Sequence, residues 1–461
     1  MTREHSAGSD TVDVVGVMNH AEFRGVPVLV SVLTVLAMVF DGFDIQAIAF
    51  AAPGVLAEFG IGRPQLGPIL AAGLVGIAVG AFVLGPAGDR FGRRFALTAS
   101  LIIVAVMSLG AATAQSPEQL AAWRFATGIG LGGVVPNCTT LMLEFAPLAV
   151  RNTIVVLTVV GVPIGGVLGA AVAAQIMPVF GWRAIFVVGA ALLGVLALVI
   201  LLWLPESPRY LARVGNQGAR LAALLNRITR RNDFRENMQF EVREADQSAK
   251  PASVSTLLSP QYRRDTLLIW LIFLTNIFAV YAFFNWLPTV LSAAGLSLTI
   301  ALRGALVFNL GGVLAALLLA ACMSRFGSRP TLAAVGAGAI LTTLAMGFVH
   351  VVPASAAAPS QGVVLLLCVM GLSGACILGM QTCMYAVAAS AYPTSVRSTG
   401  VGWASGLSRV GGILSSFAGG ALLAQGGGMQ PFFIAIAVVL IPTLLGVLLL
   451  RRHLPATRAV T

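Results

Sequence analysis

Residues 85–94 read Gly-Pro-Ala-Gly-Asp-Arg-Phe-Gly-Arg-Arg, and residues 324–329 read Ser-Arg-Phe-Gly-Ser-Arg. Both stretches are short polar turns that join long apolar segments. They share the order Arg-Phe-Gly-x-Arg, and each stands at the same place in its half of the chain. The repeat indicates an internal duplication, which is typical of membrane proteins that rock one half against the other around a central site.

The segments around these turns are too apolar for a soluble protein. The 461 residues are 58% hydrophobic and only 10% charged, and their mean hydropathy is +0.93. A soluble chain of this length needs a charged surface to stay in solution. The residues before the first apolar segment are polar and include acidic side chains, so we expect no secretory signal.

The apolar segments are long enough to cross a bilayer, because about 20 apolar residues in a helix span the hydrocarbon core. We therefore predict an all-α integral membrane protein with two pseudo-symmetric bundles of six transmembrane helices. Residues 1–204 form the first half, residues 205–265 a central loop and residues 266–461 the second half. The twelve spans are expected at residues 27–50, 66–87, 95–114, 119–143, 153–175, 183–204, 266–290, 303–323, 331–349, 362–386, 398–424 and 431–450.

The net charge of +11 comes from basic residues in the turns on one side of the expected membrane. Only Arg63, Arg183 and Arg303 fall at the other side of the membrane. Basic loops face the cytoplasm, so we expect both termini there, in the inner membrane of a bacterium. The basic charge indicates a lipid bilayer as partner and no nucleic acid. Around residues 217–228 the central loop has amphipathic spacing; a helix on the membrane surface and a solvated linker both remain open.

Few residues favour metal or enzyme chemistry. Cys368, Cys376 and Cys383 can share one helix face, which allows a soft-metal path, but no histidine joins them and packing explains them better. Residues 371–374, Gly-Leu-Ser-Gly, are similar to the serine motif of rhomboid proteases, but no histidine lies deep enough to act as a base. We expect no metal, no cofactor and no enzymatic activity.

Motifs in the first half resemble those of the major facilitator superfamily. Residues 85–94 resemble its signature between the second and third spans, and residues 124–133, Arg-Phe-Ala-Thr-Gly-Ile-Gly-Leu-Gly-Gly, resemble its fourth-span motif. Glu144-Phe-Ala-Pro147 followed by Arg151, and Pro205-Glu-Ser-Pro-Arg209, resemble features that its sugar and organic-acid carriers share.

A narrower resemblance, over essentially the whole chain, is to the aromatic acid:H⁺ symporter family. It rests on Asp41-Gly-Phe-Asp44, on Asn285-Trp-Leu-Pro288 and on residues 392–403. The resemblance implies a proton-coupled symporter that imports a small aromatic carboxylate, such as a hydroxybenzoate or protocatechuate, by alternating access. The chain departs from the pattern at Ser324, where a carboxylate is common, and at residues 406–409, where a second glycine often precedes the arginine.

Four ionisable side chains fall well inside the expected spans, where a charge costs several kcal/mol and is a functional candidate. They are Asp41, Asp44, Arg124 and Arg409. Asp41 and Asp44 share one helix face, and two close carboxylates disfavour joint ionisation, so the pair can load and release a proton. At 1.5 Å per residue, Arg124 and Asp44 lie about 10 Å and about 13 Å from the outer edge. An Asp44–Arg124 pair that breaks on protonation is therefore feasible; a permanent structural pair is the alternative.

Arg409 is expected near mid-membrane in a half that contains no acid, since no Asp or Glu occurs in residues 266–461. It either pairs across the halves with Asp41 or binds an anion, and a planar guanidinium fits a carboxylate bidentately. We expect Arg409 to bind the substrate, Asp44 and Arg124 to form an outer switch, and Asp41 to link proton and substrate.

Neutral side chains are candidates to complete the substrate pocket, although each alone is more often a packing residue. We expect Asn285 and Tyr385 to contribute first, followed by Gln381 and Trp403. The remaining candidates are Asn276, Tyr281, Phe283, Phe284 and Trp286.

Charged residues at the inner ends of the spans form a second group. Acidic residues are interspersed among the basic ones, which an anchor of positive charge alone does not explain. We expect these residues to form a network that closes an inner gate and breaks to open it. They are Asp89, Arg90, Arg93, Arg94, Glu144, Arg151, Glu206, Arg209 and Arg397.

Other substrates remain open: a sugar, a non-aromatic organic acid, or a drug moved outward. Residues 161–166 resemble a motif of drug antiporters, although close helix packing and a bend explain them more simply. Arg409 in an acid-free half favours an anion over a cationic drug. A sensor that binds without transporting is a further alternative, and we expect a functional monomer.

Overall fold

The computed structural model describes residues 11–242, 254–349, 361–424 and 428–456. Within these ranges, twelve helices are long and apolar enough to cross a membrane, which confirms the predicted all-α membrane fold. These helices are α2 (Val26–Phe59), α3 (Arg63–Phe91), α4 (Arg93–Ala112), α5 (Pro117–Phe145), α6 (Leu148–Phe180), α7 (Arg183–Trp203), α11 (Arg263–Ala293), α12 (Leu298–Phe326), α13 (Ser328–Phe348), α14 (Gln361–Ala391), α15 (Thr394–Ala424) and α16 (Met429–Leu449).

Several helices are longer than the predicted spans. α2 has 34 residues where residues 27–50 are expected, and α6 has 33 residues where residues 153–175 are expected. A helix keeps its backbone hydrogen bonds satisfied internally, so it continues past the hydrocarbon core until a residue stops it. α2 stops at Gly60, whose φ of 62° is left-handed and favours glycine.

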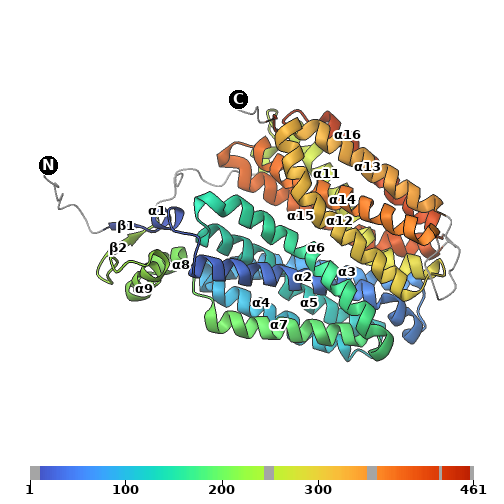
Figure 1. Ribbon diagram of the computed structural model, residues 1–461, viewed down its shortest axis with the longest axis horizontal. Coiled ribbons are helices and arrows are strands. Elements are labelled where there is room, and N and C mark those ends of the chain that lie inside the picture. The colour runs from blue at the N-terminus through green and yellow to red at the C-terminus, as the bar shows by residue number, and fades with distance from the viewer. Residues whose placement is uncertain (1–10, 243–253, 350–360, 425–427, 457–461) are drawn as a thin grey trace.

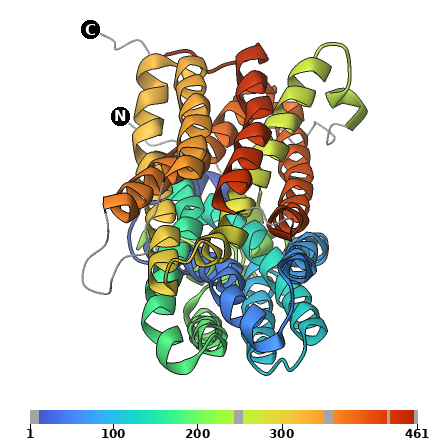
Figure 2. The same ribbon diagram turned by 90° about the vertical axis from the view of Figure 1, so that its right-hand side faces the viewer.

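The helices form two bundles of six. α2–α7 make up the lower, blue-to-green bundle of Figure 1, and α11–α16 make up the upper, yellow-to-red bundle. Figure 2 shows the same division from the right-hand side of Figure 1. We call the end that carries α1 (Val14–Asn19), α8 (Pro208–Val214) and α9 (Gly218–Thr229) the loop end, and the opposite end the far end.

The duplicated turns have the same backbone conformation in both halves. Gly92 (φ 97°, ψ 148°) joins α3 to α4, and Gly327 (φ 82°, ψ 165°) joins α12 to α13. In each half the chain after the sixth helix returns to this turn: Glu206 accepts a hydrogen bond of 3.2 Å from the backbone N–H of Arg94. The backbone N–H of Ser328 likewise donates to the carbonyl of Leu454 at 2.9 Å. The duplication therefore extends to single turns.

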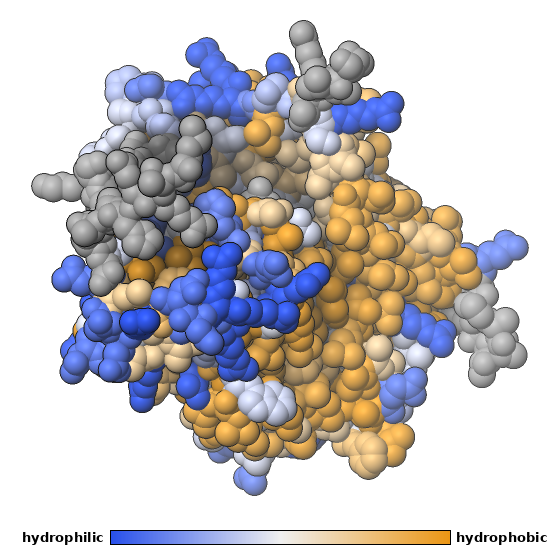
Figure 3. All heavy atoms as spheres, turned by 60° about the vertical axis from the view of Figure 1, so that its left-hand side comes forward, coloured by the Kyte–Doolittle hydropathy of each residue, from blue (hydrophilic) through white to orange (hydrophobic). Residues whose placement is uncertain are grey.

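The outward faces of the spans are apolar. Phe82, Leu318 and Trp203 are 84%, 66% and 63% exposed, which is unfavourable in water and suits a lipid environment. Figure 3 shows the apolar belt along the flank and hydrophilic residues gathered over the loop end. The molecule is therefore a multi-pass membrane protein.

One face of α15 shows how the halves meet. Near the far end, Ile413 packs against the core of the first half, and Ser416 and Gly420 approach α3 closely. Gly402 and Gly406 lie on the same helix face, nearer the loop end, and a Cβ built on either meets nothing within 4 Å. The halves are therefore joined towards the far end and separated towards the loop end.

A buried amide pair links the halves near the middle of the molecule. Gln46 of α2 donates to Asn309 of α12 at 3.2 Å, and Asn309 donates back at 2.9 Å. Gly166 of α6 leaves room for both amides, because a Cβ at that position would collide with them. The pair satisfies both side chains where no water reaches them.

A small subdomain covers the loop end of the first half. β1 (Thr11–Asp13) pairs in parallel with β2 (Gln239–Glu241) beside α1, α8 and α9, and the short α10 (Val254–Leu257) precedes α11. The apolar face of α9 is buried in the same core as α2 and α5. The amphipathic segment is therefore a helix that covers protein, and neither the membrane-surface helix nor the solvated linker describes it. Residues 243–253 of the central loop lie outside the described residues.

Candidate functional site

Asp44 of α2 and Arg124 of α5 form an ion pair in the interior of the first half. Arg124 Nη1 lies 2.9 Å from Asp44 Oδ2, and Arg124 Nη2 donates to the Asp44 carbonyl at 3.1 Å. Ser108 of α4 donates to Asp44 Oδ1 at 2.6 Å, and the Arg124 guanidinium lies over the Phe186 ring at 5.7 Å. Both oxygens of a fully buried carboxylate are thus satisfied. The pair expected from depth is present; its role as a switch remains a prediction.

Ser108 is a residue that the sequence did not single out. It is fully buried, and its hydroxyl holds one of the two Asp44 oxygens. A serine in an apolar span usually bonds to the backbone of its own helix, so its identity alone carries no signal. Only the tertiary arrangement that brings Ser108 of α4 next to Asp44 of α2 gives it this partner.

Asp41 lies one helical turn from Asp44 in a different environment. It is 1% exposed, and neither carboxyl oxygen has a hydrogen-bond partner among the described residues. Asp44 and Arg409 are close enough to interact with it electrostatically. A bare carboxylate without hydrogen bonds costs several kcal/mol in the interior, and a proton on Asp41 removes that cost.

Arg409 of α15 is half-buried on the face that borders the separation between the halves. Tyr281 of α11 interacts electrostatically with Arg409, Asp41 and Tyr385, and its ring packs against Gly412, less than one turn from Arg409. The Tyr385 hydroxyl of α14 lies 3.4 Å from Ser405, one turn before Arg409. An arginine, an acid and two phenols from four helices therefore meet in the middle of the molecule.

An amide pair borders this group. Asn276 of α11 donates to Gln381 of α14 at 2.9 Å and to the Ile377 carbonyl at 3.2 Å. Asn276 is 1% exposed, and Gln381 is half-buried. Gln381 is therefore placed as a neighbour of the Arg409 group, together with Asn276.

Asn285 and Trp403 lie elsewhere. Asn285 donates to Ser416 at 3.0 Å and shares with Arg124 a cavity of about 10 Å³, the size of one water molecule. Trp403 is 48% exposed and lies against Trp270 on the outward side of α15. Asn285 thus belongs with the Asp44–Arg124 pair, and Trp403 faces away from Arg409.

The other aromatic candidates are packing residues. Phe283 stacks on Phe308 at 4.6 Å, Phe284 meets Phe308 edge-on at 6.2 Å, and Trp286 is fully buried against α15. Tyr281 and Tyr385, which the sequence suggests as polar side chains of the pocket, are aromatic residues that lie near Arg409.

The charges at the loop end of the first half contact one another within that half. Arg93 pairs with Asp89 and donates to Asn137 at 3.4 Å. Glu206 accepts from the Arg94 backbone at 3.2 Å, so it caps the start of α4. Arg90 lies over its neighbour Phe91 at 5.2 Å.

The remaining gate candidates follow the same pattern. Glu144 is buried and interacts with Arg93, Arg209 and Glu206, and Arg151 donates to Asn19 of the N-terminal subdomain at 2.7 Å. Arg397 is exposed near the start of α15, in the second half. The described contacts of the acidic members thus stay inside the first half. The role of these residues in a gate stays a prediction.

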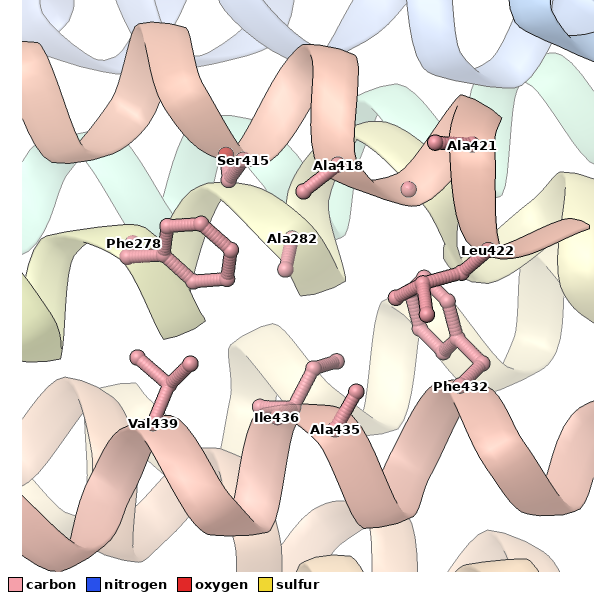
Figure 4. A pocket seen from close by; sticks show the side chains of 11 residues that line it. Phe278, Ala282, Ser415, Ala418, Ala421, Leu422, Phe432, Ala435, Ile436 and Val439 are labelled. Carbon is pink, nitrogen blue, oxygen red and sulfur yellow. The ribbon is translucent and has the colours of Figure 1, made fainter.

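Two apolar cavities lie within the second half. One of about 320 Å³ opens between α11, α15 and α16, and Figure 4 shows Phe278, Leu422 and Ile436 around it. The other, of about 690 Å³, lies between α12, α13 and α14 and includes Cys368 and Cys376. Neither is lined by a charged residue, so neither suits a carboxylate. In the part of the chain that the structure describes, no group of three or more His, Cys, Asp or Glu could hold a metal.

Comparisons with known proteins agree with this architecture. The profile of the Major Facilitator Superfamily matches residues 34–385. The chain is 35% identical to a gallate transporter of Pseudomonas putida over 436 residues, 94% of each chain. It is 31% identical to the 4-hydroxybenzoate transporter PcaK of Acinetobacter baylyi over 444 residues, 96% of this chain and 94% of that one.

Solved structures share the fold. The xylose transporter XylE of Escherichia coli, in a partially occluded inward-open conformation, has a TM-score of 0.71 at 16% identity, over 92% of this chain and 97% of XylE. At this identity the likeness concerns the fold alone. The chain is a transporter and not an enzyme. It belongs to the major facilitator superfamily and, within it, to the family of aromatic acid transporters.

Proposed function

We propose that the protein is a proton-coupled symporter that imports a small aromatic carboxylate, of the hydroxybenzoate or protocatechuate kind, by alternating access. It acts as a monomer in the inner membrane of a bacterium, with the loop end and both termini in the cytoplasm. The observation that carries the proposal is Arg409, a half-buried cation at the opening between the halves. It lies near Asp41, a buried acid without a hydrogen-bond partner in the described part of the chain.

Arg409 binds the substrate carboxylate. Its planar guanidinium can donate two parallel hydrogen bonds to one carboxylate, and Tyr281 and Tyr385 offer ring faces and edges beside it. The named substrates of the two relatives, gallate and 4-hydroxybenzoate, are aromatic acids and support this choice. A cationic drug fits the site poorly, because Arg409 repels it.

Asp41 carries the proton. Its carboxyl is buried, accepts no hydrogen bond from the residues that the structure describes, and is close enough to Arg409 to interact with its charge. When a substrate carboxylate occupies Arg409, that positive charge is neutralised, and Asp41 then favours its protonated form more strongly. Substrate and proton therefore enter together, and loss of one to the cytoplasm promotes loss of the other.

Asp44 and Arg124 form the outer switch. A proton on Asp44 weakens the ion pair that ties α2 to α5, and the packing of α2 against α11 carries the change to the second half. The charges at the loop end then form the inner gate in the opposite conformation. The two fluxes are coupled only if a carrier that has bound the proton alone, or the substrate alone, does not change readily between its outward-open and inward-open conformations.

Uptake into proteoliposomes tests the proposal. Under an inward proton gradient, radiolabelled 4-hydroxybenzoate, protocatechuate or gallate should accumulate above its external concentration, and a protonophore should abolish the accumulation. Xylose and a non-aromatic acid such as succinate serve as matched controls and should not accumulate. Accumulation that persists with the protonophore would contradict proton coupling. Uptake of succinate without uptake of any aromatic acid would contradict the substrate class.

A further inference from the structure

The amide pair next to Arg409 has two unused polar atoms. Asn276 Oδ1, an acceptor, and Gln381 Nε2, a donor, are both buried and have no hydrogen-bond partner among the described residues. Buried polar atoms are almost always paired. An open acceptor and an open donor on two hydrogen-bonded amides therefore indicate a missing group that can both donate and accept.

The orientation of the two amides is fixed by the backbone. The Ile377 carbonyl can only accept, so it must face the Asn276 amino group. That same amino group also donates to Gln381 Oε1, so the Gln381 carbonyl faces Asn276 and its amino group faces away. The open acceptor and the open donor thus follow from the hydrogen-bond network.

The pair lies at about the same depth as the proposed carboxylate site. Gly411 of α15 packs against the Leu274 carbonyl of α11, and Arg409 and Asn276 each lie two residues from that contact. At 1.5 Å per residue, Asn276 is about 20 Å and Arg409 about 22 Å from the loop-end starts of their helices. Tyr281 and Tyr385 lie on the same two helices as the amides.

We propose that Asn276 and Gln381 recognise a ring hydroxyl group of the substrate, so that the carrier selects hydroxylated aromatic acids over unsubstituted ones. The hydroxyl donates to Asn276 Oδ1 and accepts from Gln381 Nε2, while the carboxylate at the other end of the ring is bound by Arg409. This inference rests on the proposed function, because it assumes that Arg409 binds the carboxylate.

The discrimination follows from the unpaired amides. A site with buried polar groups rejects an analogue that lacks their partner much more strongly than an apolar pocket rejects an extra or missing methylene. Benzoate, without the hydroxyl, leaves both amide atoms unpaired. We expect kcat/KM for 4-hydroxybenzoate to exceed that for benzoate by about tenfold or more.

The test compares initial uptake of 4-hydroxybenzoate and benzoate in the wild type, Gln381→Met and Asn276→Leu. Each variant should lower the 4-hydroxybenzoate/benzoate ratio of kcat/KM by about tenfold, mainly through slower 4-hydroxybenzoate uptake. Asn309→Leu, which removes an amide at the contact between the halves, should change both rates and leave the ratio unaltered.

Each outcome decides between the two proposals. A ratio that stays at the wild-type value in both variants overturns the hydroxyl assignment while leaving the transporter assignment intact. If the wild type takes up neither of these acids, nor protocatechuate or gallate, the proposed function itself is overturned. If a variant is folded but transports too slowly, equilibrium binding of the two acids to the purified protein gives the same ratio.

Discussion

Asp41 and Asp44 lie one turn apart on α2, and their partners assign them different tasks. Asp44 accepts from Arg124 and Ser108, an arrangement that suits an ionised carboxylate. Asp41 has no hydrogen-bond partner among the described residues, an arrangement that suits a carboxyl with a proton. Two adjacent acids can therefore be in opposite protonation states at the same time.

Asp44→Asn should abolish proton-driven accumulation and leave substrate exchange. The amide keeps the shape of the side chain but cannot be ionised, so the pair with Arg124 cannot form and break. Accumulation under a proton gradient and counterflow without one are the two measurements. Asp265→Asn, an acid at the start of α11 outside this pair, is the matched control. Normal accumulation by Asp44→Asn would rule out the switch.

Arg409→Ala should raise KM for 4-hydroxybenzoate by about thirtyfold or more, since losing one partner of a desolvated charge pair costs about 2 kcal/mol or more. Arg409→Lys should give an intermediate KM, because a lysine keeps the charge but not the bidentate geometry. Arg397→Ala, on the same helix but at the loop end, should change kcat rather than KM. An unchanged KM in Arg409→Ala would show that Arg409 has only a structural role.

The sequence could predict residues whose position along a helix decides their contact. Counting residues from the helix ends matched Asp44 with Arg124, and the ion pair is present. Counting residues gives the depth of a side chain along its helix. It gives neither the side of the helix on which that side chain lies nor the residue that it meets on a neighbouring helix. Ser108 was therefore missed, Trp403 lies on the outward face, and Asn285 lines a small cavity together with Arg124.

At the scale of elements, the Gln46–Asn309 pair connects α2 to α12 across the two halves. Replacing Gln46 by leucine leaves Asn309 Oδ1 buried without its donor, although the Asn309 amino group keeps its bond to the Ala305 carbonyl. Gln46→Leu should therefore favour the conformation opened at the far end. The double variant Gln46→Leu/Asn309→Leu should lie closer to the wild type, with a coupling energy of about 1 kcal/mol.

Spin labels at Gln115 and Ala294, both exposed in far-end turns of opposite halves, measure this shift. The single variant should populate longer distances between the labels than the wild type does. Labels placed within one half, at Gln115 and Gly60, should show no change. A distance distribution in Gln46→Leu identical to that of the wild type would show that the amide pair does not hold the far end closed.

The C-terminal segment 450–456 is fastened to α13 through His453. Its ring nitrogens lie 3.0 Å from the Ser328 hydroxyl and 3.1 Å from the Val447 carbonyl. Burial lowers the pKa of His453 below its ordinary value of about 6.5, and Arg329 nearby lowers it further. The folded state thus favours the neutral ring, so its contribution to stability is complete above about pH 6.5 and is lost as the pH falls.

Acidification from about pH 7.5 to about pH 5.5 should therefore lower the unfolding temperature of the wild type more than that of His453→Gln. Thermal unfolding of the purified protein at both pH values is the measurement. His20→Gln, an exposed histidine at the end of α1, controls for the general effect of acid. An equal loss in the wild type and His453→Gln would show that this contact does not depend on pH.

The sequence predicted that each of the twelve apolar segments forms a helix, because a segment that crosses lipid must be a long apolar helix. Their ends were less predictable, since an amphipathic turn beyond the hydrocarbon has no hydropathy signal. β1 and β2 could not be predicted, because strands of three residues have no measurable period and their pairing joins the two ends of the first half.

At the scale of the whole molecule, the structure is open at one end and closed at the other. One face of α15 contacts α3 at Gly420, near the far end. Nearer the loop end, at Gly402, the same face has open space in front of it. In a cysteine-free background, Gly402→Cys should react with a membrane-impermeant thiol reagent added from the loop end and not from the far end. Ala404→Cys, fully buried on the same helix, should react slowly from either side. Equal labelling of Gly402→Cys from both sides would contradict a closed far end.

The parallel pairing of β1 with β2 also sets the earliest point in the synthesis of the chain at which the N-terminal subdomain can form. A ribosome makes the chain from its N-terminus, so β1 is synthesised before the first span, and its partner only after the sixth. β1 therefore has no partner strand while α2–α7 enter the bilayer. It can pair with β2 once β2 has been synthesised, before α11 leaves the ribosome. The first half can thus be completed, with β1 docked on β2, before the second half is synthesised. A defective insertion of the early spans would leave this strand undocked at the surface of the nascent protein.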